Sequence, residues 1–271
     1  MTSACDVTVV VPAYNAEQFI TRTLESVAAQ TAQPLEVLVV DDGSVDGTCA
    51  TVDAFARAHP DCTVRLLREP HRGPGAARNA GVRAARTEWV SFLDSDDLWH
   101  RDKLATVIAA VNAHPAANLF CHNEIVRLLD GRERVTNYAA NFSYDQPVTR
   151  QLYRENFFST SAVVCRRALV VRWKGFDENL SSAQDYELWL RMSPDLCPVF
   201  IPQALGTYVL RQGNISTSRF WRRLRNAVWV KRRHRHKVGL GQFVYQTSRV
   251  VTLHLAAPAR ALAGHLLKRR A

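Results

Sequence analysis

The chain has 271 residues and a formal net charge of +10, from 35 Lys and Arg against 25 Asp and Glu. This length suits one large α/β domain with a small extension. The six cysteines are scattered without a Cys-x-x-Cys pair, which is typical of reduced thiols and argues against a zinc site or a disulfide framework.

The first predicted element is a Val-rich strand over residues 7–11, which runs into the polar turn Pro12–Ala13–Tyr14–Asn15. Asn15 and Gln18 indicate the start of a helix, and apolar residues recur at helical spacing over residues 20–28. A strand followed by a polar turn and a helix is therefore expected at the N-terminus.

The same pattern follows at once. A strand over residues 35–40 runs into Asp41–Asp42–Gly43–Ser44, and Val52, Phe55 and Ala56 supply the inward face of the next helix. Strand–helix alternation of this kind predicts parallel strands covered by helices.

The most informative element is the apolar strand over residues 89–93, which ends in Asp94, Asp96 and Asp97. Carboxylates beside a core are costly unless something positive sits there. Residues i and i+2 of an extended stretch point the same way, so Asp94 and Asp96 can share one site for Mg²⁺ or Mn²⁺. The alternative is a solvated turn in which Asp97 helps to cap the next helix.

Polar residues at three strand ends should meet. In parallel sheets covered by helices, ligands collect at the carboxyl ends of the strands, and Tyr14, Asp41, Asp42, Asp94 and Asp96 all fall there. We expect these side chains to line one cleft.

Six motifs in this order resemble those of the family 2 glycosyltransferases. They lie at residues 12–15, 41–48, 75–81, 92–97, 175–178 and 184–191. The resemblance covers about residues 5 to 216 and implies the GT-A fold, a Rossmann-like α/β domain with a mostly parallel central sheet. We expect residues 1–216 to form this catalytic domain, with 1–118 as the nucleotide-sugar and metal half and 119–216 as the acceptor half.

The resemblance also implies roles for individual residues. Tyr14 would stack on the base of a nucleotide-sugar, and Asp42 would accept a hydrogen bond from uracil N3–H, which favours a UDP-sugar. Asp94 would lie near the ribose and the metal, and Asp96 would coordinate a divalent cation that acts as a Lewis acid on the diphosphate. The other expected nucleotide-sugar contacts are Pro12, Ala13, Asp41, Arg78, Asn79 and Ser95. For Arg78, a salt bridge to a nearby aspartate is an equally good interpretation.

Asp185 is the predicted catalytic base, because it precedes the apolar run 188–190 at the start of an apparent helix. It would take the proton of an acceptor hydroxyl as the oxygen attacks the anomeric carbon, and a single displacement inverts that carbon. The alternative is a helix N-cap. Two departures from the family pattern stand out: Gln184 replaces a common Glu, which should leave the pKa of Asp185 less raised, and Arg211 replaces a common His, where it could hold phosphate directly.

Residues 196–271 contain no Asp or Glu and 15 Lys and Arg. Trp221, Leu224 and Val228 recur at helical spacing among arginines, which indicates an interfacial helix on an anionic membrane surface. The apolar run 250–259 is too short to span a bilayer. We therefore expect residues 217–271 to form a basic amphipathic helical tail that binds the membrane; a helical lid packed on the catalytic domain is the alternative, and a nucleic-acid partner is less favoured.

The middle of the chain, about residues 119–173, says least. Asp130–Gly131 reads as a hairpin turn. The aromatic side chains of Tyr144, Tyr153, Phe157 and Phe158 could stack on sugars, although filling a core is the simpler interpretation.

Together these features predict an inverting, metal-dependent glycosyltransferase that moves a sugar from a UDP-sugar to a hydroxyl of a glycan or lipid-linked acceptor, as in bacterial surface polysaccharide synthesis. Residues 1–6 show no secretory signal, so we expect the protein in the cytoplasm, peripheral on the inner face of the membrane. The alternatives are a nucleotidyltransferase that makes nucleotide-sugars, which usually has a longer Gly- and Lys-containing loop after the first strand, and a non-catalytic membrane-binding relative.

Overall fold

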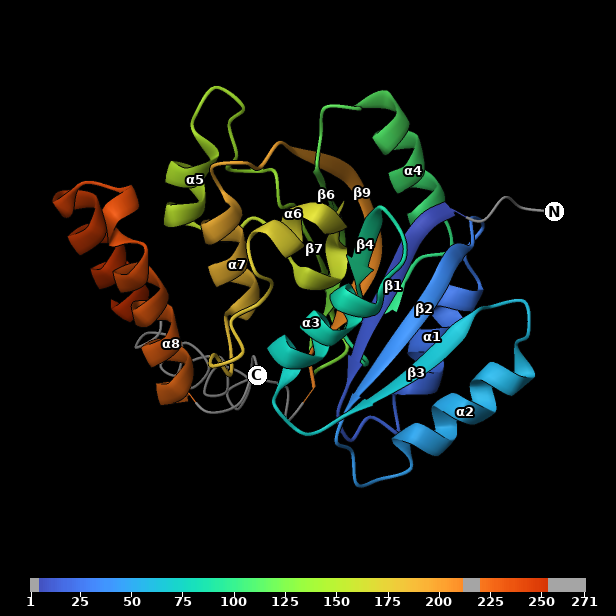
Figure 1. The fold of residues 1–271 in the computed structure, drawn as a ribbon. Helices are drawn as coiled ribbons and strands as arrows, with labels where there is room; N and C mark the ends of the chain where they lie inside the picture. Colours follow the sequence, from blue (N-terminus) through green and yellow to red (C-terminus); the bar gives the residue numbers. More distant parts are fainter. Residues whose placement is uncertain (1–4, 212–219, 253–271) are drawn as a thin grey trace, which may run out of the picture.

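The computed structural model describes residues 5–211 and 220–252 (Figure 1). The first half contains β1 (Cys5–Ala13), α1 (Ile20–Ala28), β2 (Pro34–Asp42), α2 (Thr48–Ala58), β3 (Val64–Glu69), α3 (Pro74–Ala84), β4 (Trp89–Phe92), β5 (Leu98–Trp99) and α4 (Lys103–Ala113). The second half contains β6 (Leu119–Arg127), β7 (Glu133–Thr136), α5 (Val148–Arg154), β8 (Val163–Arg166), α6 (Arg167–Arg172), α7 (Gln184–Met192), β9 (Pro198–Val209) and α8 (Phe220–Arg233). A further helical stretch is described from residue 240 to residue 252.

The strands form one sheet in the order β3-β2-β1-β4-β8-β6-β9-β5, with β7 paired to β6. β3, β2, β1 and β4 are mutually parallel, as predicted. Beyond β4 the sheet is mixed, because β8 runs antiparallel to both β4 and β6 while β6 and β9 are parallel. The predicted α/β fold is confirmed, and its parallel character is strongest from β1 to β4.

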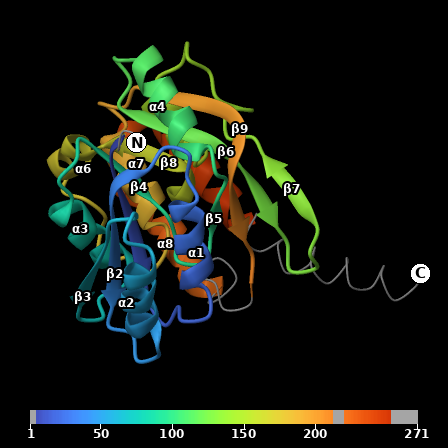
Figure 2. The same cartoon turned by 90° about the vertical axis from the view of Figure 1, so that its right-hand side faces the viewer.

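Strand β1 is buried on both faces, which explains its continuous Val run. Val9 and Val11 pack in the cluster that contains α1 and α2, whereas Val10 packs with α3 on the opposite face (Figures 1 and 2). Helix α3 approaches closely, because a Cβ atom on Gly81 would lie only 2.3 Å from Cγ1 of Val10. The glycine is therefore required where α3 crosses β1.

The turn after β1 differs from the predicted helix start. Helix α1 begins at Ile20, and Asn15 adopts a left-handed conformation with φ of 48°. Its side-chain oxygen accepts a hydrogen bond from the backbone N–H of Val45 at 2.9 Å. Asn15 thus joins the turns after β1 and β2 instead of capping a helix.

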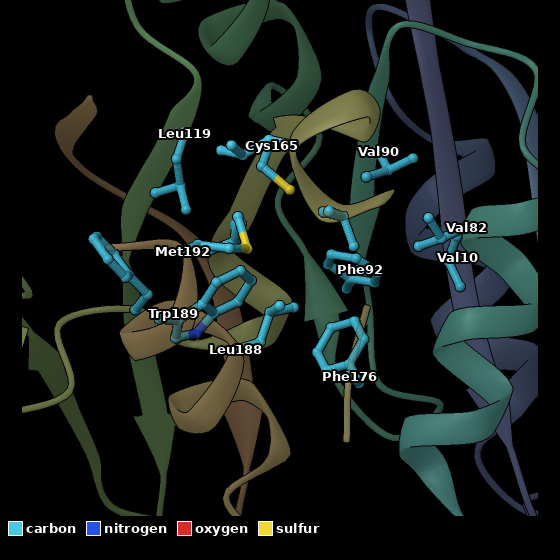
Figure 3. Close-up of a cluster of buried hydrophobic side chains, with 14 of the residues drawn as sticks. Val10, Val82, Val90, Phe92, Leu119, Cys165, Phe176, Leu188, Trp189 and Met192 are labelled. Atoms are coloured by element: carbon cyan, nitrogen blue, oxygen red, sulfur yellow. The ribbon is translucent and has the colours of Figure 1, made fainter. Parts of the chain in front are cut away.

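An aromatic cluster fixes α7 against the sheet (Figure 3). The ring of Phe176 lies edge-on to Phe92 of β4, with 5.2 Å between ring centroids, and to Trp189 of α7, with 6.2 Å. Leu188 and Met192 of α7 are fully buried in the same cluster. These contacts therefore hold α7, whose first turn carries Asp185, in place against the sheet.

The middle region follows its two sequence predictions. β6 and β7 form an antiparallel hairpin around Gly131, which projects from the domain (Figure 2). Tyr153, Phe157 and Phe158 are buried, as expected of core residues, whereas Tyr144 is exposed.

Helix α8 packs on the catalytic domain beside α5 and α7, at the end of the molecule opposite α2 (Figure 1). The lid alternative therefore describes α8. The buried residues of α8 are Asn226, Val230 and Lys231, and His234, which follows the helix directly, is buried too, so this face is mainly polar. The predicted apolar stripe does not form the buried face, since Trp221 is 72% exposed and Leu224 and Val228 are only half-buried.

Parts of the tail predictions concern residues 217–219 and 253–271, which lie outside the described residues. None of the described helices is long and apolar enough to cross a bilayer.

Candidate active site

The carboxyl ends of β1, β2 and β4 open into a cleft with a volume of about 880 Å³. Eight of the predicted site residues line it: Pro12, Ala13, Tyr14, Asp42, Arg78, Asp94, Ser95 and Asp96. Residues that lie far apart in the sequence thus line one cleft, as the strand-end pattern predicts.

The aromatic wall of the cleft is a stacked pair. The ring centroids of Tyr14 and His71 lie 4.2 Å apart with 23° between the ring planes, and Tyr14 is 47% exposed. Nδ1 of His71 lies 2.9 Å from a carboxylate oxygen of Asp42, which orients the imidazole. The sequence prediction missed His71, because its position depends on the loop after β3 folding back on Tyr14.

Asp42 holds that loop in place. Its carboxylate accepts hydrogen bonds from the backbone N–H groups of Arg72 at 2.8 Å and Gly73 at 2.9 Å. Gly73 has a φ of 94°, which favours glycine at this turn. Asp42 is therefore both a lining residue and the anchor of the loop, and its predicted contact with a base stays a prediction.

Two predicted nucleotide contacts lie outside the lining of the cleft. Asp41 accepts a hydrogen bond from the backbone N–H of Ser44 at 3.2 Å and so shapes its own turn. Asn79 is buried against the loop before α7, where its side chain donates to the carbonyl of Phe176 and accepts from the backbone N–H of the same residue. Both residues support the site from behind instead of facing a ligand.

The two strand-end carboxylates are each matched by an arginine. Nη2 of Arg78 lies 2.6 Å from Oδ1 of Asp94, which confirms the salt-bridge interpretation while Arg78 also lines the cleft. Nε and Nη2 of Arg211 both lie 2.7 Å from Oδ2 of Asp96. Arg211, which was expected to hold phosphate, binds the predicted metal ligand in this structure.

The carboxylates that line the cleft are suited to a divalent cation that also binds the phosphates of a substrate. Mg²⁺ is commonly bound by one or two carboxylates plus substrate phosphates, and Asp94 and Asp96 supply two carboxylates facing one cleft. Among the described residues no group of three or more His, Cys, Asp or Glu could hold a metal without such help. Burial and the charge of Asp94 raise the pKa of Asp96, which a cation there would counteract.

Asp97 does not cap a helix. It is buried, and its carboxylate accepts hydrogen bonds from the hydroxyl of Ser161 at 2.7 Å and from the backbone N–H of Val209 at 3.0 Å. Burial, together with the neighbouring Asp94, raises the pKa of Asp97 well above its ordinary value. Asp97 therefore ties β9 and the turn before β8 to the carboxylate turn after β4.

Asp185 lines a second cavity of about 510 Å³. It lies in the first turn of α7, after Ala183 in a left-handed conformation, and Nδ2 of Asn156 is 3.5 Å from its carboxylate. Burial raises the pKa of Asp185, and the charge of Arg78 opposes that rise. Gln184 is buried beside it, so the pKa is raised without a second carboxylate at that position.

The two cavities share part of their walls. The shared residues are Arg78, Asp94, Ser182, Tyr208 and Arg223. The predicted metal ligands and the predicted base therefore stand on connected surfaces.

Helix α8 contributes to both cavities, which the sequence prediction missed. Arg222 and Arg223 line the cleft, and Arg223 and Ala227 line the cavity of Asp185. The signal was present in the arginines of the tail, but the pattern alone could not show that they face the catalytic domain.

Buried polar contacts hold α8 beside the base. Side-chain Nδ2 of Asn226 donates to the hydroxyl of Ser182 at 2.9 Å, and Nζ of Lys231 donates to the hydroxyl of Tyr186 at 2.6 Å. Glu187 of α7 is contacted by Arg233, the last residue of α8, at 3.4 Å and by the following His234 at 3.2 Å. These contacts lie on both sides of Asp185 in sequence.

A family model described as Glycosyl transferase family 2 matches residues 8–171, which is more than half of the chain. The chain belongs to the family 2 glycosyltransferases. This assignment makes it a transferase and speaks against the nucleotidyltransferase alternative.

Several curated members of the family are similar in sequence. Succinoglycan biosynthesis protein ExoO of Rhizobium meliloti (strain 1021) is 38% identical over 223 residues, covering 78% of this chain and 62% of that protein. Chondroitin synthase of Escherichia coli is 34% identical over 193 residues, covering 69% of this chain and 26% of that protein. The chain thus spans less than two thirds of the length of these two relatives.

A third relative is closer in length. The Escherichia coli protein named UDP-Glc:alpha-D-GlcNAc-diphosphoundecaprenol beta-1,3-glucosyltransferase WfgD is 28% identical over 218 residues, covering 79% of this chain and 81% of WfgD.

Solved glycosyltransferase structures show the same fold. S. aureus TarS 1–349 in complex with UDP-GlcNAc has a TM-score of 0.72 at 23% identity, covering 93% of this chain and 73% of TarS. The mannosyltransferase PcManGT from Pyrobaculum calidifontis, in complex with GDP-Man and Mn²⁺, has a TM-score of 0.69 at 22% identity, covering 98% and 81%. The GT-A fold is thereby confirmed.

Proposed function

We propose that this family 2 glycosyltransferase transfers a sugar, with inversion, from a UDP-sugar to a hydroxyl of a glycan or lipid-linked acceptor in surface polysaccharide synthesis. The observation that carries the proposal is the shared wall between the cleft of Asp94 and Asp96 and the cavity of Asp185. A donor in the first and an acceptor in the second would meet at that wall.

The chemistry assigned to Asp185 needs a carboxylate next to the acceptor hydroxyl. Asp185 takes the hydroxyl proton while the oxygen attacks the anomeric carbon and the bond to the nucleoside diphosphate breaks. Burial raises the pKa of Asp185, which makes it a stronger base than an exposed aspartate, and Arg78 keeps its ionised form accessible. One base and one displacement suffice for inversion.

The donor site combines stacking with charge. Tyr14, already stacked on His71, offers a ring face for a base, and the arginines around the cleft attract a diphosphate. Asp94 and Asp96 would hold a divalent cation, which when bound stabilises the charge on the departing diphosphate. The solved neighbours bind UDP-GlcNAc in one case and GDP-Man with Mn²⁺ in another, so the uridine preference rests on Asp42.

A lipid-linked acceptor agrees with the name of WfgD, which specifies a diphosphoundecaprenol acceptor for that protein. It also agrees with the tail of this chain. Along α8, Trp221, Arg225, Trp229 and Arg232 are exposed and recur at the spacing of one helical face. We define these four residues as the outer face of α8.

The outer face supports peripheral attachment to an anionic leaflet on the cytoplasmic side. Aromatic rings suit the headgroup region and arginines suit anionic lipids, with about 1 kcal/mol per basic residue near such a surface. Leu240, Val244 and Tyr245 in the following helical stretch add exposed apolar area. The described residues thus combine a packed lid with a surface suited to a membrane.

The transfer reaction is tested by mass spectrometry with UDP-, dTDP- and GDP-sugars, Mn²⁺ or chelator, and a glycosyl acceptor linked to a diphosphate lipid. We expect metal-dependent product from a UDP-sugar and at least about 100-fold less from Asp185→Asn. Product from GDP-sugars alone would contradict the uridine assignment.

Attachment is tested by sedimentation with vesicles of phosphatidylglycerol and phosphatidylcholine. We expect Trp221→Ser with Trp229→Ser to lose binding, and high salt to weaken it for the unmodified protein. Val135→Ser, at an exposed apolar residue of the β7 hairpin, is the matched control. Unchanged binding of the double variant would contradict the membrane assignment.

A further inference from the structure

Arg223, a cation of the candidate active site, has no counter-ion among the described residues. Arg223 is half-buried and lines both the cleft and the cavity of Asp185. It makes no ion pair or hydrogen bond with any described residue, in contrast to Arg78 and Arg211, which are held by Asp94 and Asp96. A guanidinium partly withdrawn from water is favourable only if an anion reaches it.

Arg223 lies in the first turn of α8, and this helix packs beside α5 and α7 (Figure 1). The buried contacts of Asn226 with Ser182 and of Lys231 with Tyr186 follow it within eight residues on the same helix. These partners flank Asp185. Arg223 is therefore carried by the same packing that holds the first turn of α7.

The cavity of Asp185 carries less negative charge than the number of its carboxylates suggests. Asp94 is neutralised by Arg78, and Asp97 is satisfied by Ser161 and the backbone of Val209. Gln184, beside the predicted base, is a neutral amide whose Nε2 is buried without a hydrogen-bond partner in the described structure. This leaves Asp185 as the carboxylate that needs an acceptor hydroxyl, and Arg223 as the cation that needs an anion.

We propose that Arg223 binds a phosphate of the acceptor, so that the sugar accepting the transfer is attached directly to a phosphate or diphosphate. This inference rests on the proposed function and names the acceptor class for it. The phosphate would lie between the cavity and the outer face of α8, with its lipid leading toward the membrane. A fork of guanidinium donors matches phosphate oxygens, whereas Lys offers only a point charge.

The test compares two probes with the same sugar and chain: decyl GlcNAc-diphosphate and the uncharged decyl GlcNAc glycoside. Their binding to the full-length protein is measured by calorimetry in the presence of UDP and Mn²⁺, below the critical micelle concentration. We expect the diphosphate to bind more tightly than the glycoside, and Arg223→Gln to weaken the diphosphate at least about tenfold while leaving the glycoside unchanged. Arg235→Gln, an exposed arginine after α8, is the control and should change neither.

The other possible results separate the acceptor assignment from its alternatives. If Arg223→Gln weakens binding of UDP instead, the anion is the donor diphosphate and the acceptor assignment is wrong. Equal affinity of the unmodified protein for both probes, or equal loss on both in the variant, also overturns it. Because binding is measured without turnover, a protein that prefers the diphosphate but transfers no sugar would contradict the proposed function and not this inference.

Discussion

Nζ of Lys231 in α8 lies 2.6 Å from the hydroxyl oxygen of Tyr186, the residue that follows the predicted base Asp185. The same Nζ donates to the backbone carbonyl of Tyr153, and the hydroxyl of Tyr153 donates to the carbonyl of Lys231 at 2.9 Å. Helix α8 is therefore coupled to the helix that carries the predicted base.

The pH dependence of stability should report on this lysine. Burial lowers the pKa of Lys231 to about 7, from an ordinary 10.5, with a smaller effect from Arg249. Between these values the unfolded chain binds the proton that the folded chain releases, so the free energy of unfolding rises with pH, by up to about 1 kcal/mol per pH unit.

Urea unfolding between pH 7 and pH 9 measures this rise. We expect Lys231→Met to flatten it in part, leaving the smaller slope from Lys237, whose pKa burial also lowers. An identical slope in the variant would show that Lys231 is not the responsible group.

Glu187 should be the main electrostatic anchor of α8. It is fully buried, and although burial alone would raise its pKa, hydrogen bonds from His234 and Arg191 lower the pKa to about 2. Glu187→Gln leaves the guanidinium groups of Arg191 and Arg233 with a neutral partner and should cost about 3–5 kcal/mol of unfolding free energy at pH 7. Glu133→Gln, at the exposed pair with Arg127, should cost less than about 1 kcal/mol.

Low pH should remove the stabilisation that ionised Glu187 provides. The folded pKa of Glu187 is depressed, so its stabilisation is present above the ordinary value of 4.5 and is lost as pH falls toward about 2. Chemical unfolding at pH 7 and pH 3 should therefore bring Glu187→Gln and the unmodified protein closer together. A difference that stays constant with pH would contradict the pairing.

Removal of α8 should abolish transfer to every acceptor. A chain that ends at residue 218 loses the contacts of Asn226 with Ser182, of Lys231 with α5 and α7 and of His234 with α7, as well as Arg223 from both cavities. We expect transfer to be lost with soluble and lipid-linked acceptors alike. Full activity on a soluble acceptor would show that α8 serves only the membrane.

Metal binding should depend on Asp96. Even outer-shell partners of metal ligands typically contribute 10–100-fold to affinity, so Asp96→Asn should weaken Mn²⁺ binding in the presence of UDP by more than about tenfold. Electron paramagnetic resonance of free Mn²⁺ measures it, and circular dichroism checks the fold. Asp53→Asn, at an exposed carboxylate paired with Arg68, is the control; equal affinities in the two variants would exclude Asp96 as a ligand.

The sequence predicts the cleft at the strand ends better than the cavity of Asp185. Strand ends are local features, and parallel topology brings Tyr14, Asp42 and Asp96 into one cleft without further information. The position of His71 depends on the loop after β3 folding back. The buried face of α8 is polar, and its partners, such as Ser182 and Glu187, lie far away in sequence. Hydrophobic periodicity carries no signal for such a face.

Asp185 is expected to act on the acceptor beside, and not within, the donor site. Paired measurements of turnover and of UDP-sugar affinity by calorimetry test it on Asp185→Asn. We expect turnover to fall by about 10²–10⁴-fold and the Kd for the UDP-sugar to stay unchanged. Unmodified protein should lose turnover as pH falls through the raised pKa of Asp185. Loss of donor binding in the variant, or turnover close to that of the unmodified protein, would contradict the account.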